Sequence, residues 1–365
     1  MDGPAGLVTV PARLSTALSG PVVRGVVATA ALFVIIAGLR AAAPILMPLA
    51  LAIFLAALGL PVVNGLRRLR VPTPLAIFVV VLLNAAAVAA VGGILLVSAA
   101  ELRTELPVYI SRAIELEQAL RAKLLLYGVD IGTSLRADLV EPQRVLDYAA
   151  RLARKATSIA TTVFLVFLYL IFILAESPTF ARKVKRVLGP DARGVEGAEA
   201  TLKEIQRYLV LKTVISMTTG TLIGIGAQVL GVDFALLWGF LAFVLNFIPS
   251  VGSVIAALPA IGVALLQLGP GSALALTAVY LVVNVSIGNV ADPIIVGRQL
   301  RLSPIVILVS LVFWGWTFGI VGAFLALPLT IALRIGLEHT TSLSRYAALM
   351  GPLDAKSAAT DRSAP

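Results

Sequence analysis

Polar side chains that could bind a solute lie inside the apolar blocks of the last third of the chain. Asn246, Ser250 and Ser253 interrupt the mostly apolar residues 234–268. Amides and hydroxyls form hydrogen bonds without carrying a charge, and polar groups at membrane depth usually face a protein interior. We therefore expect an uncharged, hydrogen-bonding site for a small polar solute. The alternative is that each asparagine only links neighbouring helices.

A second set of polar residues belongs to the apolar block at 272–290. Asn284 and Asn289 lie within it, and Asp292 follows Asn289 on the same face of a helix. Proton-coupled transport normally uses an acid or a histidine inside the membrane. No acid lies at the centre of an apolar block, and the single histidine, His339, lies near the end of the last block. This pattern disfavours proton coupling unless a broken helix brings Asp292 inward.

Composition assigns the chain to membrane proteins. Of its residues 59% are hydrophobic and 13% are charged, against about 25% charged in a typical soluble domain. The apolar residues form long blocks, and a run of about 18 or more indicates a membrane span. We predict an all-α integral membrane protein in contact with the lipid bilayer. The net charge of +10 comes from basic residues in short loops, which indicates membrane topology rather than a nucleic-acid partner.

We expect about six plain transmembrane helices separated by polar segments. The alternative interpretation of the first apolar block is a cleaved signal peptide. We favour a membrane span because the next apolar block follows almost at once. The six helices are predicted at residues 22–39, 44–63, 74–99, 158–175, 209–230 and 272–290. The chain then divides into a mobile N-terminal tail (1–21), N-terminal transmembrane helices (22–100), an amphipathic helical segment (101–157), transmembrane helices with a cytoplasmic basic stretch at 176–207 (158–230), a transport core with two opposed hairpins (231–339) and a disordered cytoplasmic tail (340–365).

The segment at 101–157 differs from the apolar blocks because its acidic and basic residues nearly balance. Leu102, Leu106 and Ile110 recur at four-residue steps, which is typical of an amphipathic helix. We predict two or more helices that form an extracytoplasmic cap or lie at the membrane surface.

Two long apolar stretches are interrupted. Residues 234–268 contain a break at 249–253, and residues 304–337 contain a break at 314–322. A membrane span needs only about 20 residues, so neither stretch can be one straight helix. We expect two broken or re-entrant hairpins that open to opposite sides, an arrangement that recurs in transporters. The alternatives are pairs of short full crossings, or simple kinks in packed helices.

The basic loops predict the orientation. With a cytoplasmic N-terminus, the arginines at 67–70, the basic run in 176–207, Arg298 and Arg301 all lie in the cytoplasm, as the positive-inside rule requires. If both broken stretches return to the side that they left, the C-terminus is cytoplasmic too. We predict a multi-pass protein of a bacterial cytoplasmic (inner) membrane.

Motifs of soluble enzymes are missing. The chain has no cysteine, and one histidine cannot build a zinc site. It contains no zinc-protease, nucleophile-elbow or phosphate-binding-loop motif. Glycines within residues 220–226 lie in an apolar helix and indicate close helix packing. We therefore predict no enzyme activity, catalytic residue, metal site or cofactor.

Three motifs of the second half resemble those of a known family. Residues 247–252 resemble an F-I-P-x-x-G element, residues 292–298 with 302–304 resemble a P-x-x-x-G-x…L-x-P element, and residues 319–322 with 326–329 resemble a closing G-x-x-G…P element. The chain resembles the autoinducer-2 exporter family, also called PerM-like permeases. This resemblance implies an oligomeric bacterial inner-membrane permease, with export of small signalling molecules or, in some members, sodium–proton exchange. Two positions, those of Ser250 and Ser253, depart from the usual family pattern.

The sequence thus favours a secondary transporter or exporter of a small polar molecule, acting as a homo-oligomer. A sodium(lithium)/proton antiporter using Asp292 or Glu176 is one alternative, and a non-transporting scaffold or sensor acting through 101–157 is another. The candidate pathway residues are Asn246, Pro249, Ser250, Gly252, Ser253, Asn284, Asn289, Asp292, Pro293, Gly297, Pro304, Gly319, Gly322 and Pro328.

Overall fold

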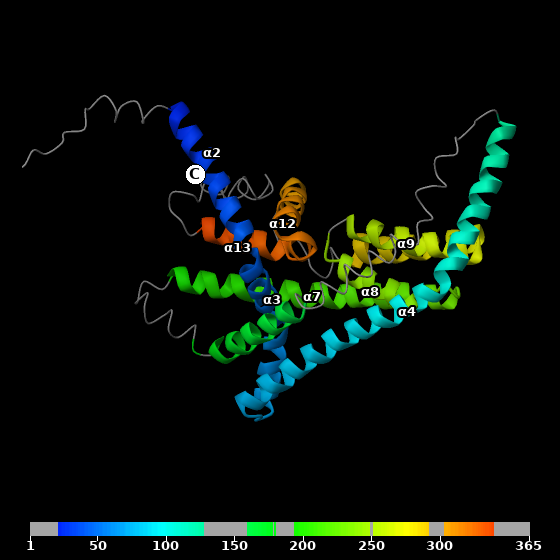
Figure 1. Cartoon of the computed structure of the whole chain (residues 1–365). Coiled ribbons are helices and arrows are strands. Elements are labelled where there is room, and N and C mark those ends of the chain that lie inside the picture. The colour runs from blue at the N-terminus through cyan, green and yellow to red at the C-terminus, as the bar shows by residue number, and fades with distance from the viewer. Residues whose placement is uncertain are drawn as a thin grey trace, which may run out of the picture.

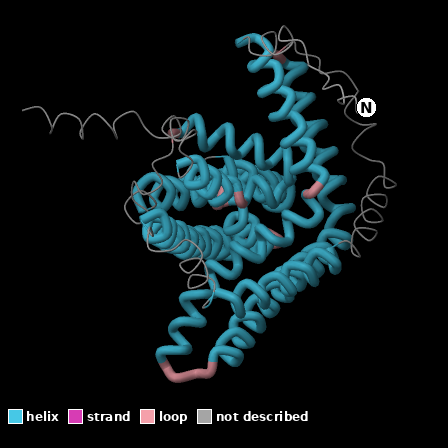
Figure 2. The backbone as a smooth tube through the Cα atoms, turned by 90° about the vertical axis from the view of Figure 1, so that its left-hand side faces the viewer, coloured by secondary structure: helices cyan, strands magenta, loops and turns pink. Residues whose placement is uncertain are grey.

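The structure is a computed structural model that describes residues 21–127, 159–177, 179, 193–248, 251–291 and 303–338. Within these residues every regular element is a helix (Figure 2). Seven of the helices are long and apolar enough to cross a membrane. The prediction of an all-α integral membrane protein is therefore confirmed.

The N-terminal part of the chain forms three helices, α2 (Pro21–Ala41), α3 (Ala43–Arg68) and α4 (Thr73–Leu126). The apolar section of α2, Gly25–Ala41, is shorter than the seven long spans. Its end is tied to the second half of the chain, because the Arg40 guanidinium lies 4.7 Å from the ring centroid of Trp316. A cation over an indole face is electrostatically favourable.

Helix α4 continues across residue 100, where the sequence predicted a change from membrane span to amphipathic segment. It runs for 54 residues, or about 80 Å at 1.5 Å per residue, whereas the hydrocarbon core is about 30 Å thick. The composition changes near Glu101, but the backbone stays helical there because the residues favour helix. The helix changes direction in its second half (Figure 1), and Pro107 inside it removes a hydrogen bond. The part of the predicted amphipathic segment at 128–157 lies outside the described residues.

Helices α7 (Arg193–Val229) and α8 (Ala235–Leu245) lie side by side because glycines let their backbones meet (Figure 1). A Cβ added to Gly220 would lie 2.5 Å from the carbonyl oxygen of Gly239, and a Cβ on Gly239 would lie 2.7 Å from that of Gly220. The predicted role of the 220–226 glycines in helix packing is therefore confirmed.

The first long apolar stretch is a helical hairpin. Helix α8 has 11 residues, about 16 Å, which is too short to span a membrane. The chain turns after Leu245 and returns as α9 (Val251–Leu268). Helix α10 (Pro270–Asn284) follows and passes into a π-helical segment, η1 (Val285–Ala291). The predicted interruption of residues 234–268 is confirmed.

The second long stretch is also interrupted. Helix α12 (Pro304–Phe324) leaves helical geometry at Gly319, where φ is 69° and ψ is −152°. Glycine suits this position because a side chain would be strained at positive φ. Helix α13 (Ala326–Glu338) follows and packs back on α12. Its contact is fixed in part by a hydrogen bond of 3.0 Å from Trp314 Nε1 to Thr330 Oγ1.

Candidate functional site

The two interrupted stretches meet at an aromatic contact. Phe247 follows α8 at the turn of the first hairpin, and Phe324 ends α12. Their ring centroids lie 4.5 Å apart. Phe54 of α3 packs edge-on against both, with centroids 5.9 Å from Phe247 and 5.1 Å from Phe324. We call this contact of Phe54, Phe247 and Phe324 the hairpin junction.

Each hairpin turn is held tight by a glycine. A Cβ on Gly252 would overlap the carbonyl oxygen of Leu245, and a Cβ on Gly322 would overlap that of Trp314. In both places the backbone returns so closely on itself that no side chain fits. These contacts explain the two glycines by backbone packing, independently of any solute.

A polar stripe on α7 contacts the first turn. Lys212, Ser216 and Thr219 lie four and three residues apart, so they share one helix face, and they are 6%, 0% and 2% exposed. The Asn246 amide Nδ2 donates a hydrogen bond of 2.9 Å to Ser216 Oγ. Thr219 Oγ1 donates to the carbonyl of Ile215 in its own helix. The stripe and the hairpin junction are therefore joined through Asn246.

The predicted pathway residues are divided by the structure. Asn246 and Gly252 lie at the first turn, and Ser253, next along α9, is half-buried. Asn284 ends α10, and its Nδ2 donates a hydrogen bond of 2.8 Å to the Tyr280 carbonyl of the same helix. Asn289 lies in the π-helical η1, and π-helical turns frequently occur at functional sites.

The remaining candidates lie in or near the second stretch. Gly319 and Gly322 form its break, Pro304 begins α12, and Pro328 is half-buried in α13. Ile287 of η1 packs against the same cluster as Phe247 and Phe324. The candidates outside the described residues are Pro249, Ser250, Asp292, Pro293 and Gly297.

Lys212 is a buried residue that lies outside the predicted pathway set. A lysine near the end of an apolar block can extend its amine to the membrane surface, but the side chain of Lys212 is buried in the protein. Its spacing to Ser216 and Thr219 could have revealed it, since the three polar residues recur on one face. Ionisable residues buried at membrane depth usually serve function. Glu176, the second candidate acid, is exposed at the end of the 159–177 helix.

Interrupted helices that meet beside buried polar side chains are a recurring construction of secondary transporters. The fold and this junction place the chain in the class of multi-pass membrane transport proteins. Comparison with known sequences agrees: the chain belongs to the AI-2E family transporters, whose family pattern matches residues 29–342.

Several curated relatives match most of the chain. The AI-2 transport protein TqsA of Escherichia coli K12 is 35% identical over 323 residues, covering 88% of this chain and 94% of TqsA. A relative in Haemophilus influenzae is 31% identical over 339 residues, covering 91% of this chain and 97% of the relative. The relative YhhT of Escherichia coli K12 is 33% identical over 323 residues, covering 88% of this chain and 93% of YhhT.

Proposed function

We propose that the protein is a secondary transporter that exports a small polar solute through the hairpin junction. The observation that carries this proposal is the contact of the two interrupted stretches, at Phe247 and Phe324, beside the buried polar stripe of α7. A path through a membrane protein needs polar groups at depth and an element that can move to open it. In this proposal the polar stripe of α7 supplies the polar groups, and the two hairpin turns are the elements that move.

In this proposal the aromatic rings close the pathway. Phe54, Phe247 and Phe324 come from three elements that are far apart in the chain. Because such a contact has no covalent link, the turns can separate when a solute binds. The amine of Lys212 and the amide of Asn246 would then offer hydrogen bonds to hydroxyl or carbonyl oxygens of the solute.

The cellular setting forms part of the proposal. The distribution of basic loops supports a bacterial cytoplasmic membrane with both termini in the cytoplasm. The family relationship supports a transport protein without enzyme activity, and a homo-oligomer is proposed from the same resemblance. One relative is named for AI-2 transport, so AI-2 is the first solute to test.

Cross-linking of the junction tests the pathway. The chain has no cysteine, so the pair Phe247→Cys and Phe324→Cys can be joined by a short bis-maleimide without background. We expect flux of AI-2 or another small polar metabolite in proteoliposomes to fall to the empty-liposome rate after cross-linking, and to persist in the unlinked double variant. Undiminished flux from fully cross-linked protein would contradict the proposal.

The same liposomes separate the alternatives. Imposed sodium, lithium and proton gradients identify the driving ion. Cation-driven proton movement that is lost in Asp292→Asn would support the antiporter instead. Absence of all flux from folded protein, together with loss of function on deletion of 101–157, would support the scaffold.

A further inference from the structure

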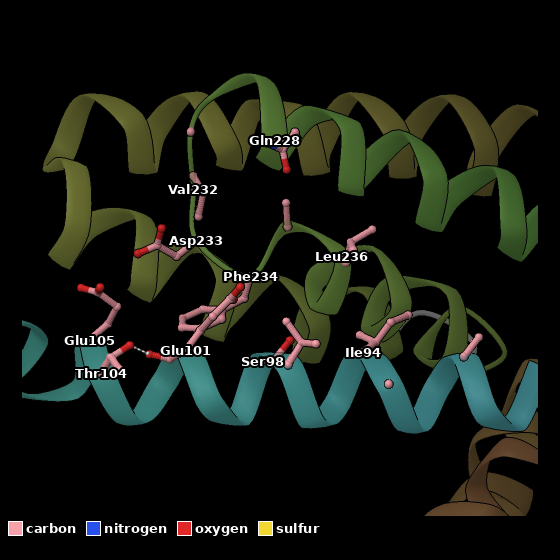
Figure 3. A pocket seen from close by; sticks show the side chains of 15 residues that line it. Ile94, Ser98, Glu101, Thr104, Glu105, Gln228, Val232, Asp233, Phe234 and Leu236 are labelled. Carbon is pink, nitrogen blue, oxygen red and sulfur yellow. Dashed lines mark hydrogen bonds between the residues drawn. The ribbon is translucent and has the colours of Figure 1, made fainter.

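A cavity lies away from the hairpin junction, between α4 and the turn that joins α7 to α8. Its volume is about 580 Å³. Figure 3 shows Ser98, Glu101 and Glu105 on α4 facing Asp233 and Phe234 of the turn. Glu101 is the first acidic residue after the apolar part of α4, so the cavity lies at a membrane surface. By the orientation proposed above, this surface is extracytoplasmic.

The cavity wall at Asp233 is held in place by hydrogen bonds. Tyr109 Oη donates to Asp233 Oδ2 at 2.5 Å. The Asp233 backbone N–H donates to Gln267 Oε1 at 2.9 Å, and Trp238 Nε1 donates to the Asp233 carbonyl at 2.7 Å. Phe234 adopts a left-handed backbone conformation, with φ of 62°. A non-glycine residue keeps this conformation only where its surroundings fix it, so the carboxylate is positioned before any ligand arrives.

Three carboxylates act on this small volume. Glu101 and Glu105 are four residues apart and lie on one face of α4, and Asp233 lies across from them. None of the fifteen described residues that line the cavity is basic. A cavity lined by charges of one sign attracts ions of the other sign, and its low-dielectric walls strengthen that attraction.

A buried hydroxyl adds a second, independent indication of a ligand. Ser98 lines the cavity and is only 7% exposed. Its hydroxyl makes no hydrogen bond within the part of the chain that the structure describes, whereas the hydroxyl of Thr104 bonds to the Glu101 carbonyl. The Ser98 hydroxyl thus borders the cavity, where it is available to form a hydrogen bond with a ligand.

We propose that this cavity binds a flexible organic amine that carries two or more ammonium groups. Glu101, Glu105 and Asp233 would hold the ammonium groups, and Ile94, Val97 and Phe234 would pack against the methylene chain between them. Ammonium groups match this lining because they carry positive charge and only donate hydrogen bonds. None of the residues that line this site belongs to the hairpin junction.

Two other ligands fit the lining less well. Among the described residues no three Asp, Glu, His or Cys side chains converge closely enough to hold a metal ion. A zwitterionic phospholipid would bring its phosphate against the same carboxylates, which like charge disfavours. A free polyamine avoids both problems.

Spermidine binding to the full-length protein in detergent, measured by calorimetry, tests the proposal. We expect the double variant Glu101→Gln, Glu105→Gln to raise the Kd at least about tenfold, which is ~1.4 kcal/mol. The control Glu115→Gln removes one negative charge from an exposed position of α4 outside the cavity. It should leave the Kd within about twofold. Ser98→Val should weaken binding without changing net charge.

Several outcomes would overturn the proposal. The proposal fails if spermidine does not bind to the folded protein, or if Glu115→Gln weakens spermidine binding as much as the double variant does. It also fails if calcium at stoichiometric concentration displaces spermidine. Displacement of spermidine by phosphatidylethanolamine added to the detergent micelles would assign the cavity to a lipid headgroup instead. Because binding is measured without flux, failure here is distinguishable from failure of the transport proposal.

Discussion

Phe247 and Phe324 pack against each other across the two interrupted hairpins, with 4.5 Å between their ring centroids and 45° between their ring planes. The two residues belong to separate stretches that each fold back on themselves. Their contact therefore couples the position of one turn to that of the other. Buried aromatic contacts have defined geometry, so this pair is suited to be either closed or separated rather than gradually deformed.

A double-mutant cycle measures this coupling. Phe247→Ala and Phe324→Ala should each lower the free energy of unfolding by about 2–4 kcal/mol, because each leaves a cavity. The interaction energy between them should be about 1 kcal/mol. Chemical unfolding in detergent, followed by circular dichroism, gives both values. Phe172→Ala is the control, since this ring is 66% exposed, and a coupling energy of zero would contradict the contact.

Substitution of Gly252 should be far more damaging than substitution of Gly262. A Cβ at Gly252 overlaps the Leu245 carbonyl, whereas a Cβ at Gly262 meets nothing within 4 Å. We expect Gly252→Ala to destabilise by about 1–3 kcal/mol and Gly262→Ala to be neutral or stabilising by up to about 1 kcal/mol. Thermal unfolding of the two variants compares them directly. Equal midpoints would show that the first turn is not so tightly closed.

Loss of the Asn246 amide should disturb the α7 stripe. Asn246→Ala leaves the fully buried Ser216 hydroxyl without its partner, at a cost of about 1–3 kcal/mol. Ser216→Ala combined with Asn246→Ala should cost less than the sum of the single changes. The control is Asn84→Ala, because the Asn84 amide donates its hydrogen bond to the Val80 carbonyl of its own helix. If the costs of the two single changes are strictly additive in the double variant, the hydrogen bond between Asn246 and Ser216 contributes nothing to stability.

Neutralising Lys212 should affect transport more than folding. Lys212→Met keeps the length and the apolar stem of this buried side chain but removes the amine. We expect the solute flux in proteoliposomes to fall at least about tenfold, because an ionisable residue at membrane depth usually serves function. Size-exclusion chromatography and thermal unfolding report whether the variant is folded. Wild-type flux in a folded variant would exclude Lys212 from the pathway.

The surroundings of Tyr109 predict that the folded protein loses stability at alkaline pH. Burial, together with the hydrogen bond to Asp233 and the nearby carboxylates, raises the pKa of Tyr109 above its ordinary value of 10.0. Above pH 10 the unfolded chain loses this proton while the folded protein keeps it. The contribution is thus fully present below pH 10 and declines as pH rises, by about 1.4 kcal/mol per pH unit. The difference in stability between wild type and Tyr109→Phe should shrink over this range, and a difference independent of pH would contradict the assignment.

Local composition was enough to predict the helices and their interruptions. Apolar runs of sufficient length indicate membrane spans, and a span must be helical because hydrocarbon offers no hydrogen bonds to an unfolded backbone. The glycines at 252, 319 and 322 stand where the backbone turns closely or adopts positive φ, and such needs are visible in residue type alone. The boundary expected after residue 100 was not a helix end, because a change in polarity does not by itself break a helix.

Contacts between distant segments were decided only by the tertiary structure. Nothing in the sequence places Phe247 on Phe324, or Asp233 opposite Glu101 and Glu105, since these pairs depend on how whole helices pack. Lys212 illustrates the same limit. Its position in an apolar block fitted an amine reaching the membrane surface, and only the packing around α7 shows that the side chain is enclosed by protein. Local propensity acts over a few residues, whereas the surroundings of a side chain are set by neighbours brought from elsewhere in the chain.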